Sequence, residues 1–147
     1  MLKGFCCTLF LLLLFSCNYK MPEIIYGQLT VHSITERGFT ISWETNYNEE
    51  EVIYECYILD SDIDYYQILG SYVATINSNL PFNYSVLRER YSSIVKIYRT
   101  DFKYLIVDDL TEDTAYFIAL FKWNPGNNTI MRYELIETRT ESRFRGQ

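Results

Sequence analysis

Three aspartates at alternate positions, Asp60, Asp62 and Asp64, are the residues whose type and spacing most resemble a metal site. Carboxylates arranged in this way can converge on Ca²⁺ if the segment forms a loop. A calcium loop of the EF-hand type would then need Gly at the position of Tyr65 and Glu at the position of Ser71, and it has neither. The preferred interpretation is a charged hairpin end or edge strand that discourages edge pairing, with calcium as the alternative and no metal expected.

Groups suited to catalysis are few. The single histidine, His32, falls in an alternating segment without an acid or nucleophile motif, so an exposed strand histidine is favoured over a general base. Cys56 lies in a similar segment with no basic neighbour, which favours a small buried side chain over a reactive thiol. One histidine and one such cysteine cannot form a closed zinc site, and no phosphate loop or nucleophile elbow is present. The sequence predicts no enzyme and no cofactor.

Fourteen tyrosines offer a different kind of chemistry, that of recognition. Tyrosine combines a large rigid contact area with a polar tip and is enriched in binding surfaces. The four around the middle of the chain, Tyr65, Tyr66, Tyr84 and Tyr91, are the predicted partner surface, and loops 45–51 and 124–129 are the second choice. The alternative is that these tyrosines only line half-buried strands.

Charge and composition restrict the partners further. The chain has 147 residues, a usual length for one domain, and its formal net charge of -6 argues against nucleic acid, which needs a basic surface. Aromatic residues make up 17% of the chain, and with Ile, Val and Thr they favour an all-β protein.

The N-terminus predicts export. Lys3 precedes an uncharged apolar run over 5–15, which has the length of a signal-peptide core and is too short to span a membrane. Leu14-Phe15-Ser16-Cys17 resembles the lipobox of bacterial lipoproteins, although Phe at its second position departs from the tightest form. The resemblance implies a signal peptide over 1–16, a lipid on Cys17, a tether over 17–21 and attachment to a membrane of the cell envelope. Plain secretion and an uncleaved anchor are the alternatives.

Short strand-like runs separated by turns follow along the mature chain. Alternating or apolar segments predict strands at 28–34, 39–43, 52–59, 94–99, 102–107, 115–122 and 130–138. One or two further strands are expected over 65–76, and a helical turn or two over 84–91, where Leu87 and Tyr91 are spaced i,i+4. This pattern predicts a β-sandwich.

Two segments resemble the fibronectin type III domain. Phe39-Thr40-Ile41-Ser42-Trp43 is similar to the strand that carries the family's core tryptophan, and Leu110 to Tyr116 is similar to its leucine and tyrosine-corner turn. The resemblance implies an immunoglobulin-like sandwich of seven or more strands over 22–140, with Trp43, Leu110 and Tyr116 in structural roles and a polar tail over 141–147. The chain is longer than the family's usual length, so an insertion is expected around residues 60–98.

Together these features predict a lipid-anchored envelope protein that binds a protein or a glycan without catalysis. The alternative from a different class is a structural subunit or spacer of an envelope assembly, and an accessory domain of a secreted enzyme is a third.

Overall fold

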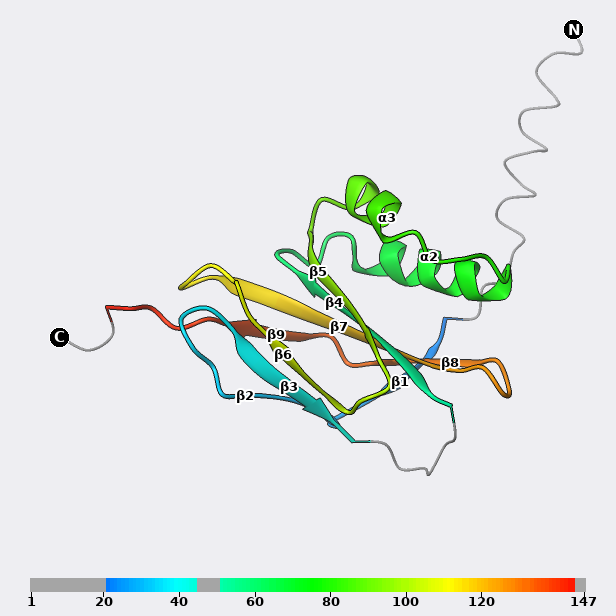
Figure 1. Ribbon diagram of the computed structural model, residues 1–147, viewed down its shortest axis with the longest axis horizontal. Helices are drawn as coiled ribbons and strands as arrows, with labels where there is room; N and C mark the ends of the chain where they lie inside the picture. The colour runs from blue at the N-terminus through cyan, green and yellow to red at the C-terminus, as the bar shows by residue number, and fades with distance from the viewer. Residues whose placement is uncertain (1–20, 45–50, 145–147) are drawn as a thin grey trace, which may run out of the picture.

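The computed structural model describes residues 21–44 and 51–144. Nine strands and two helices make up this part of the chain (Figure 1). In chain order they are β1 (Glu23–Ile25), β2 (Leu29–His32), β3 (Phe39–Trp43), β4 (Ile53–Leu59), α2 (Tyr65–Asn77), α3 (Tyr84–Arg90), β5 (Ile94–Thr100), β6 (Tyr104–Val107), β7 (Ala115–Asn124), β8 (Thr129–Tyr133) and β9 (Ile136–Arg139).

The strands form two sheets. The larger has the order β1-β8-β7-β4-β5, with β9 also paired to β7, and the smaller has the order β2-β3-β6. All pairs are antiparallel except β1 with β8, which is parallel. The predicted β-sandwich is therefore confirmed, and the strand segments outside 65–76 correspond to observed strands.

The side chains of β4 point alternately to the two faces of the larger sheet and are mostly apolar on both, so both faces must be covered. Tyr54, Cys56 and Ile58 point into a core shared with the smaller sheet. Tyr57 and Leu59 point to the opposite face and belong to a second core under the helices. Figure 1 shows α2 and α3 on the side of the larger sheet away from β2 and β3. The molecule thus has three layers: the small sheet, the large sheet and a helical layer.

The prediction of strands over 65–76 is wrong, because this segment forms the 13-residue helix α2. Its buried side chains follow the helical spacing i, i+3, i+4, i+7, i+8 and i+11 and form one apolar stripe against the sheet. They are Tyr65, Ile68, Leu69, Tyr72, Val73 and Ile76. The prediction relied on tyrosine and isoleucine being common in strands and gave less weight to the helical spacing of these residues.

The helical turns predicted over 84–91 are confirmed as α3. Asn83 caps the helix, because its side-chain oxygen accepts a hydrogen bond from the backbone N–H of Val86 at 3.3 Å. None of the α3 residues is buried. The chain leaves the large sheet after β4 and returns as β5, so the expected insertion around 60–98 is a helical lobe between two neighbouring strands.

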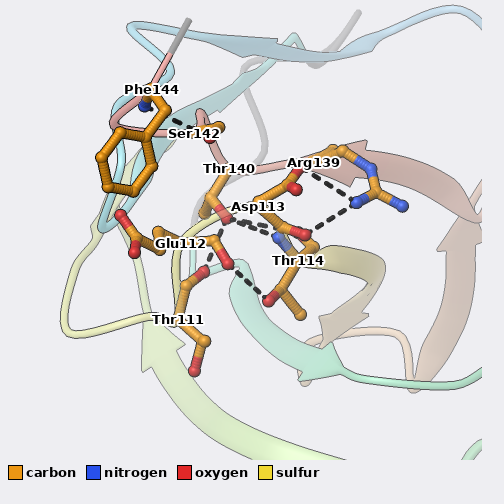
Figure 2. A network of polar contacts seen from close by, with 8 residues as sticks. All are labelled: Thr111, Glu112, Asp113, Thr114, Arg139, Thr140, Ser142 and Phe144. Atoms are coloured by element: carbon orange, nitrogen blue, oxygen red, sulfur yellow. Dashed lines mark hydrogen bonds and ion pairs between the residues drawn. The ribbon is translucent and has the colours of Figure 1, made fainter.

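The last predicted strand, over 130–138, is two strands separated by Glu134 and Leu135. β9 then ends in a polar network with the turn before β7 (Figure 2). The hydroxyl of Thr140 donates to the carbonyl of Thr111 at 2.6 Å and accepts from the N–H of Thr114 at 3.0 Å. These bonds fix the end of the closing strand against the strand that carries the tyrosine corner.

Candidate ligand-binding site

The four tyrosines predicted as a partner surface lie in different environments. Tyr66 is 64% exposed, whereas Tyr65 and Tyr91 are 4% and 6% exposed and belong to the core under the helices. Tyr84 is half-buried. Only Tyr66 among them presents most of its ring to solvent, because helix α2 places consecutive residues on different faces.

Tyr66 lies at the rim of a pocket of about 260 Å³ that Tyr65 also lines. Three segments distant in sequence form its wall: the end of β1, the start of α2 with the turn before it, and the end of β8 with the two residues that follow it. The lining residues are Ile24, Tyr26, Asp62, Tyr65, Tyr66, Arg132, Tyr133, Glu134 and Leu135. The parallel pairing of β1 with β8 sets Ile24 opposite Arg132 and so holds two of these segments together.

Arg132 is the polar centre of the pocket wall. Its Nε donates to the carbonyl of Pro22 at 3.2 Å, and its Nη1 donates to the hydroxyl of Tyr65 at 3.2 Å. The guanidinium carbon lies 5.8 Å from the ring centroids of both Tyr65 and Tyr66, within cation–π range. Within the described residues no carboxylate forms an ion pair with it. The guanidinium is therefore held in place by neutral partners.

Tyrosine rings give the pocket its apolar surface. The rings of Tyr65 and Tyr66 meet edge to face with centroids 5.1 Å apart, and Tyr26, which is 66% exposed, adds another ring to the lining. Burial raises the pKa of Tyr65, and the hydrogen bond from Arg132 offsets part of that rise, so the hydroxyl is neutral at neutral pH. The carboxylates of Asp62 and Glu134 lie on exposed residues of the same lining.

A second polar group, Glu55, is buried beneath the helical layer and was missed in the sequence. Its carboxylate accepts hydrogen bonds from the hydroxyls of Tyr57 and, at 3.2 Å, Tyr84. Burial raises the pKa of Glu55, and these two hydrogen bonds and the charge of Arg99 oppose the rise. The bond from Tyr84 ties α3 to the sheet, so we assign Glu55 a positioning role. The sequence did contain a signal for this burial. Alternation along the strand places Glu55 on the same face as Tyr57, which is opposite to that of Tyr54 and Cys56.

The three aspartates are not brought together as a metal site. Asp64 accepts a hydrogen bond from the hydroxyl of Ser93 at 2.7 Å, and Asp62 contributes its carbonyl to the turn that starts α2. No group of three carboxylate, histidine or cysteine side chains within 21–44 and 51–144 is placed to hold a metal ion. The segment 60–64 is the connection from β4 to α2 rather than a hairpin end or an edge strand.

The remaining predicted residues take structural places. Trp43 and Leu110 are 3% exposed in the core between the sheets. The hydroxyl of Tyr116 accepts the N–H of Thr111 at 3.0 Å, which is the tyrosine-corner contact. Burial raises the pKa of the Cys56 thiol, and the exposed ring of His32 lies 3.2 Å from the hydroxyl of Ser42.

Two predictions concern parts of the chain that the structure describes only in part or not at all. Cys17 and the signal segment lie outside the described residues, as does most of loop 45–51. In loop 124–129 the indole N–H of Trp123 donates to Asn128 at 3.3 Å across the β7–β8 hairpin. No helix within 21–44 and 51–144 has the length and apolar character needed to cross a membrane.

Comparison with known proteins gives the fold a name. A scan against protein-family models and a search of curated proteins found no match. Among solved structures, a protein described as a myokine is 13% identical with a TM-score of 0.52, over 82% of this chain and 99% of that one. The sixth fibronectin type III domain of human fibronectin type III domain containing protein 3 is 11% identical with a TM-score of 0.52, over 82% and 86% of the two chains.

Domains d3–d4 of the rat CD45 extracellular region are similar as well. They are 14% identical to this chain with a TM-score of 0.51, and the match covers 82% of this chain and 50% of theirs. At such identities the likeness concerns the fold alone. The domain is a fibronectin type III-like β-sandwich with a helical lobe inserted between β4 and β5.

Proposed function

We propose that this protein is a lipid-anchored recognition module of the cell envelope that binds a neutral saccharide in the pocket around Tyr66 and Arg132. Domains with this fold commonly serve as binding or spacer modules. One observation carries the proposal: Arg132 is held by a carbonyl and a tyrosine hydroxyl, without a counterion among the described residues, in a pocket lined by exposed tyrosine rings.

The chemistry of the pocket lining suits a sugar. A pyranose has apolar C–H faces, which pack against aromatic rings, and hydroxyls, which both donate and accept hydrogen bonds. Tyr26 and Tyr66 supply the rings, Arg132 supplies N–H donors, and Asp62 and Glu134 supply acceptors. A small-molecule site usually combines apolar surface with a few polar groups that fix the orientation of the ligand.

Charge selects a neutral sugar over an acidic one. Asp62 and Glu134 both line the pocket, against the single cation Arg132. The chain as a whole carries a formal net charge of -6. An anionic ligand would meet repulsion from both carboxylates and from the surrounding field, whereas the hydroxyls of a neutral sugar can donate to them.

The saccharide proposal is tested by binding the full chain, purified in detergent, to an array of neutral and acidic oligosaccharides. We expect neutral ligands to bind, and Tyr66→Ala to weaken them about tenfold, equivalent to about 1.4 kcal/mol. Phe144→Ala is the matched control, because Phe144 is also an exposed aromatic residue (79%) but follows β9, outside both the pocket and β6. Its binding should equal that of the wild type.

Three outcomes would overturn the saccharide proposal. The first is that no neutral oligosaccharide binds. The second is that only acidic sugars bind, and the third is that Tyr66→Ala binds as well as the wild type. Folding of each variant is checked by its thermal unfolding midpoint, which should change little for two exposed aromatic residues.

The lipid anchor is a separate proposal that rests on the sequence of residues 1–17. Signal cleavage before Cys17 and acylation of its thiol would leave a membrane-bound chain beginning at this residue. The expected intact mass is that of 17–147 plus diacylglycerol and one fatty acyl chain. Cys17→Ser should move the protein out of the membrane fraction, and an unmodified soluble wild-type product would contradict the anchor.

A further inference from the structure

Strand β6 is an edge strand with an exposed apolar row. It pairs only with β3 among the described strands, and the pairing has no bulge. Phe102, Tyr104 and Ile106 are 65%, 55% and 66% exposed, and the rings of Phe102 and Tyr104 lie 6.2 Å apart. Natural edge strands are usually protected by shortness, charges, proline or bulges. β6 is short, with four residues, but it has no charge, proline or bulge within 104–107.

The hydrogen-bond pattern identifies which backbone groups of β6 are free. The N–H of Trp43 donates to the carbonyl of Lys103 at 3.1 Å, whereas the N–H of Glu44 donates away from β6, to Gln28. In a strand, successive residues direct their N–H and C=O to opposite sides. Lys103, Leu105 and Val107 therefore face β3, and the N–H and C=O groups of Tyr104 and Ile106 point outward from the sheet.

From these features we propose that β6 is the contact strand of a homodimer, in which a second copy of this chain extends the small sheet by antiparallel β6–β6 pairing. Tyr104 of each copy then lies opposite Ile106 of the other, with Leu105 on the two-fold axis. Tyr104 of one copy and Ile106 of the other exchange both of their N–H···O=C bonds, so the interface is self-complementary, as a two-fold contact requires. The exposed apolar row becomes continuous across both copies, and aromatic–aliphatic cross-strand pairs stabilise such sheets.

Charge at the ends of β6 favours a second copy in this orientation. Lys103 stands before the strand, and Asp108 and Asp109 follow it. Antiparallel pairing brings the Lys103 end of one strand to the acidic end of the other. Parallel pairing would place the acidic ends together. The carboxylates of Asp108 and Asp109 lie 3.8 Å and 4.0 Å from Lys96 and Arg37 in their own chain, but both aspartates are about 80% exposed and remain accessible to a partner's lysine. In this register Asp101, in the turn before Lys103, falls at the position opposite Asp109 of the other copy, and this like-charge pair offsets part of the attraction.

The test is sedimentation of the full chain in density-matched detergent over a range of concentrations. We expect a reversible monomer–dimer equilibrium with dimer evident by ~0.1 mM, a concentration at which even modest association energies populate a dimer. Ile106→Lys should raise the dimer dissociation constant at least tenfold, because it places a cation within the apolar row. Ile63→Lys is the control, since Ile63 is 77% exposed on the β4–α2 connection, and its dissociation constant should be unchanged.

A second variant separates edge pairing from packing of the exposed faces. Ile106→Pro removes the outward N–H and leaves the β3–β6 bonds intact, which an edge strand tolerates. It should dissociate the dimer while the thermal midpoint stays close to that of the wild type. A monomer at every concentration up to ~0.1 mM, or a dimer that withstands both Ile106 variants, would overturn the proposal. Saccharide binding to the monomeric variants is expected to persist, because the pocket and β6 share no residues.

Discussion

Glu55 shows how one buried carboxylate organises the helical layer. It is 1% exposed and accepts hydrogen bonds from Tyr57 of its own strand and Tyr84 of α3. The ring of Phe82 stacks on Tyr84 with centroids 6.1 Å apart and lies under the guanidinium of Arg99, at 4.8 Å. α3 has no fully buried residue, and Leu87 packs only partly against the core, so these polar and ring contacts add to its attachment to the sheet.

The first prediction concerns the pH dependence that Glu55 imposes. Burial raises the pKa of Glu55 above its ordinary value of 4.5, so the folded protein holds this proton more tightly than the unfolded chain. The resulting stabilisation is fully present below 4.5 and is lost as the pH rises through the folded pKa. In urea unfolding, the free energy of unfolding of the wild type should fall relative to that of Glu55→Gln as the pH rises above 4.5 and through the folded pKa. A difference that stays constant or increases with pH would contradict this account.

The second prediction concerns the tyrosine corner. The Tyr116 hydroxyl accepts a hydrogen bond from the backbone N–H of Thr111, and this bond closes the turn before β7. Tyr116→Phe leaves that N–H without its partner and should lower the free energy of unfolding by about 1–2 kcal/mol. Tyr104→Phe, at an exposed site, is the control and should change it by less than about 0.5 kcal/mol. Equal effects of the two variants in denaturant unfolding would contradict the structural role of Tyr116.

At the scale of elements, α2 is the feature that builds the candidate site. It covers one face of the large sheet, and its start brings Tyr65 against Arg132 of β8. A hairpin in the same place would have exposed a different set of tyrosines. The helix therefore determines both which rings are buried and which one, Tyr66, reaches the pocket rim.

The third prediction tests that α2 is helical in solution. Gly70 lies on its exposed side, where a Cβ would meet no other atom, so Gly70→Ala should stabilise the protein by about 0.5–1 kcal/mol. Gly38→Ala is the opposed control, because a Cβ there would overlap the carbonyl oxygen of Val107 in β6. That variant should be destabilised. Destabilisation by Gly70→Ala in thermal unfolding would contradict the helix.

The elements that the sequence revealed are those whose side-chain period is unambiguous. Phe39, Ile41 and Trp43 alternate with polar residues, and they form the buried face of β3. In α2 the same aromatic and β-branched residue types occur with a period of 3.6, and residue preference was misleading where period was the better guide. Tyr66 was visible as a candidate, but Arg132 was not, because its approach to Tyr65 depends on the pairing of segments 67 positions apart.

At the scale of the whole molecule, the inserted lobe turns a two-layer sandwich into three layers with separate surfaces. The pocket lies where β1, α2 and the β8–β9 junction meet, and the exposed edge of β6 belongs to the small sheet on the other side of the large one. Two copies joined through β6 would leave both pockets open. On a membrane, paired pockets would raise the avidity for a repeating polysaccharide without further contacts.

The most direct test of the central proposal is an NMR titration of the isotope-labelled full chain in detergent with neutral hexose oligosaccharides. We expect saturable shifts of the backbone amides in residues 24–26, 62–66 and 132–135, the segments that line the pocket. In Tyr66→Ala the same shifts should require about tenfold more ligand. An absence of shifts, or shifts centred on β6 or the 111–114 turn, would contradict saccharide binding at this pocket.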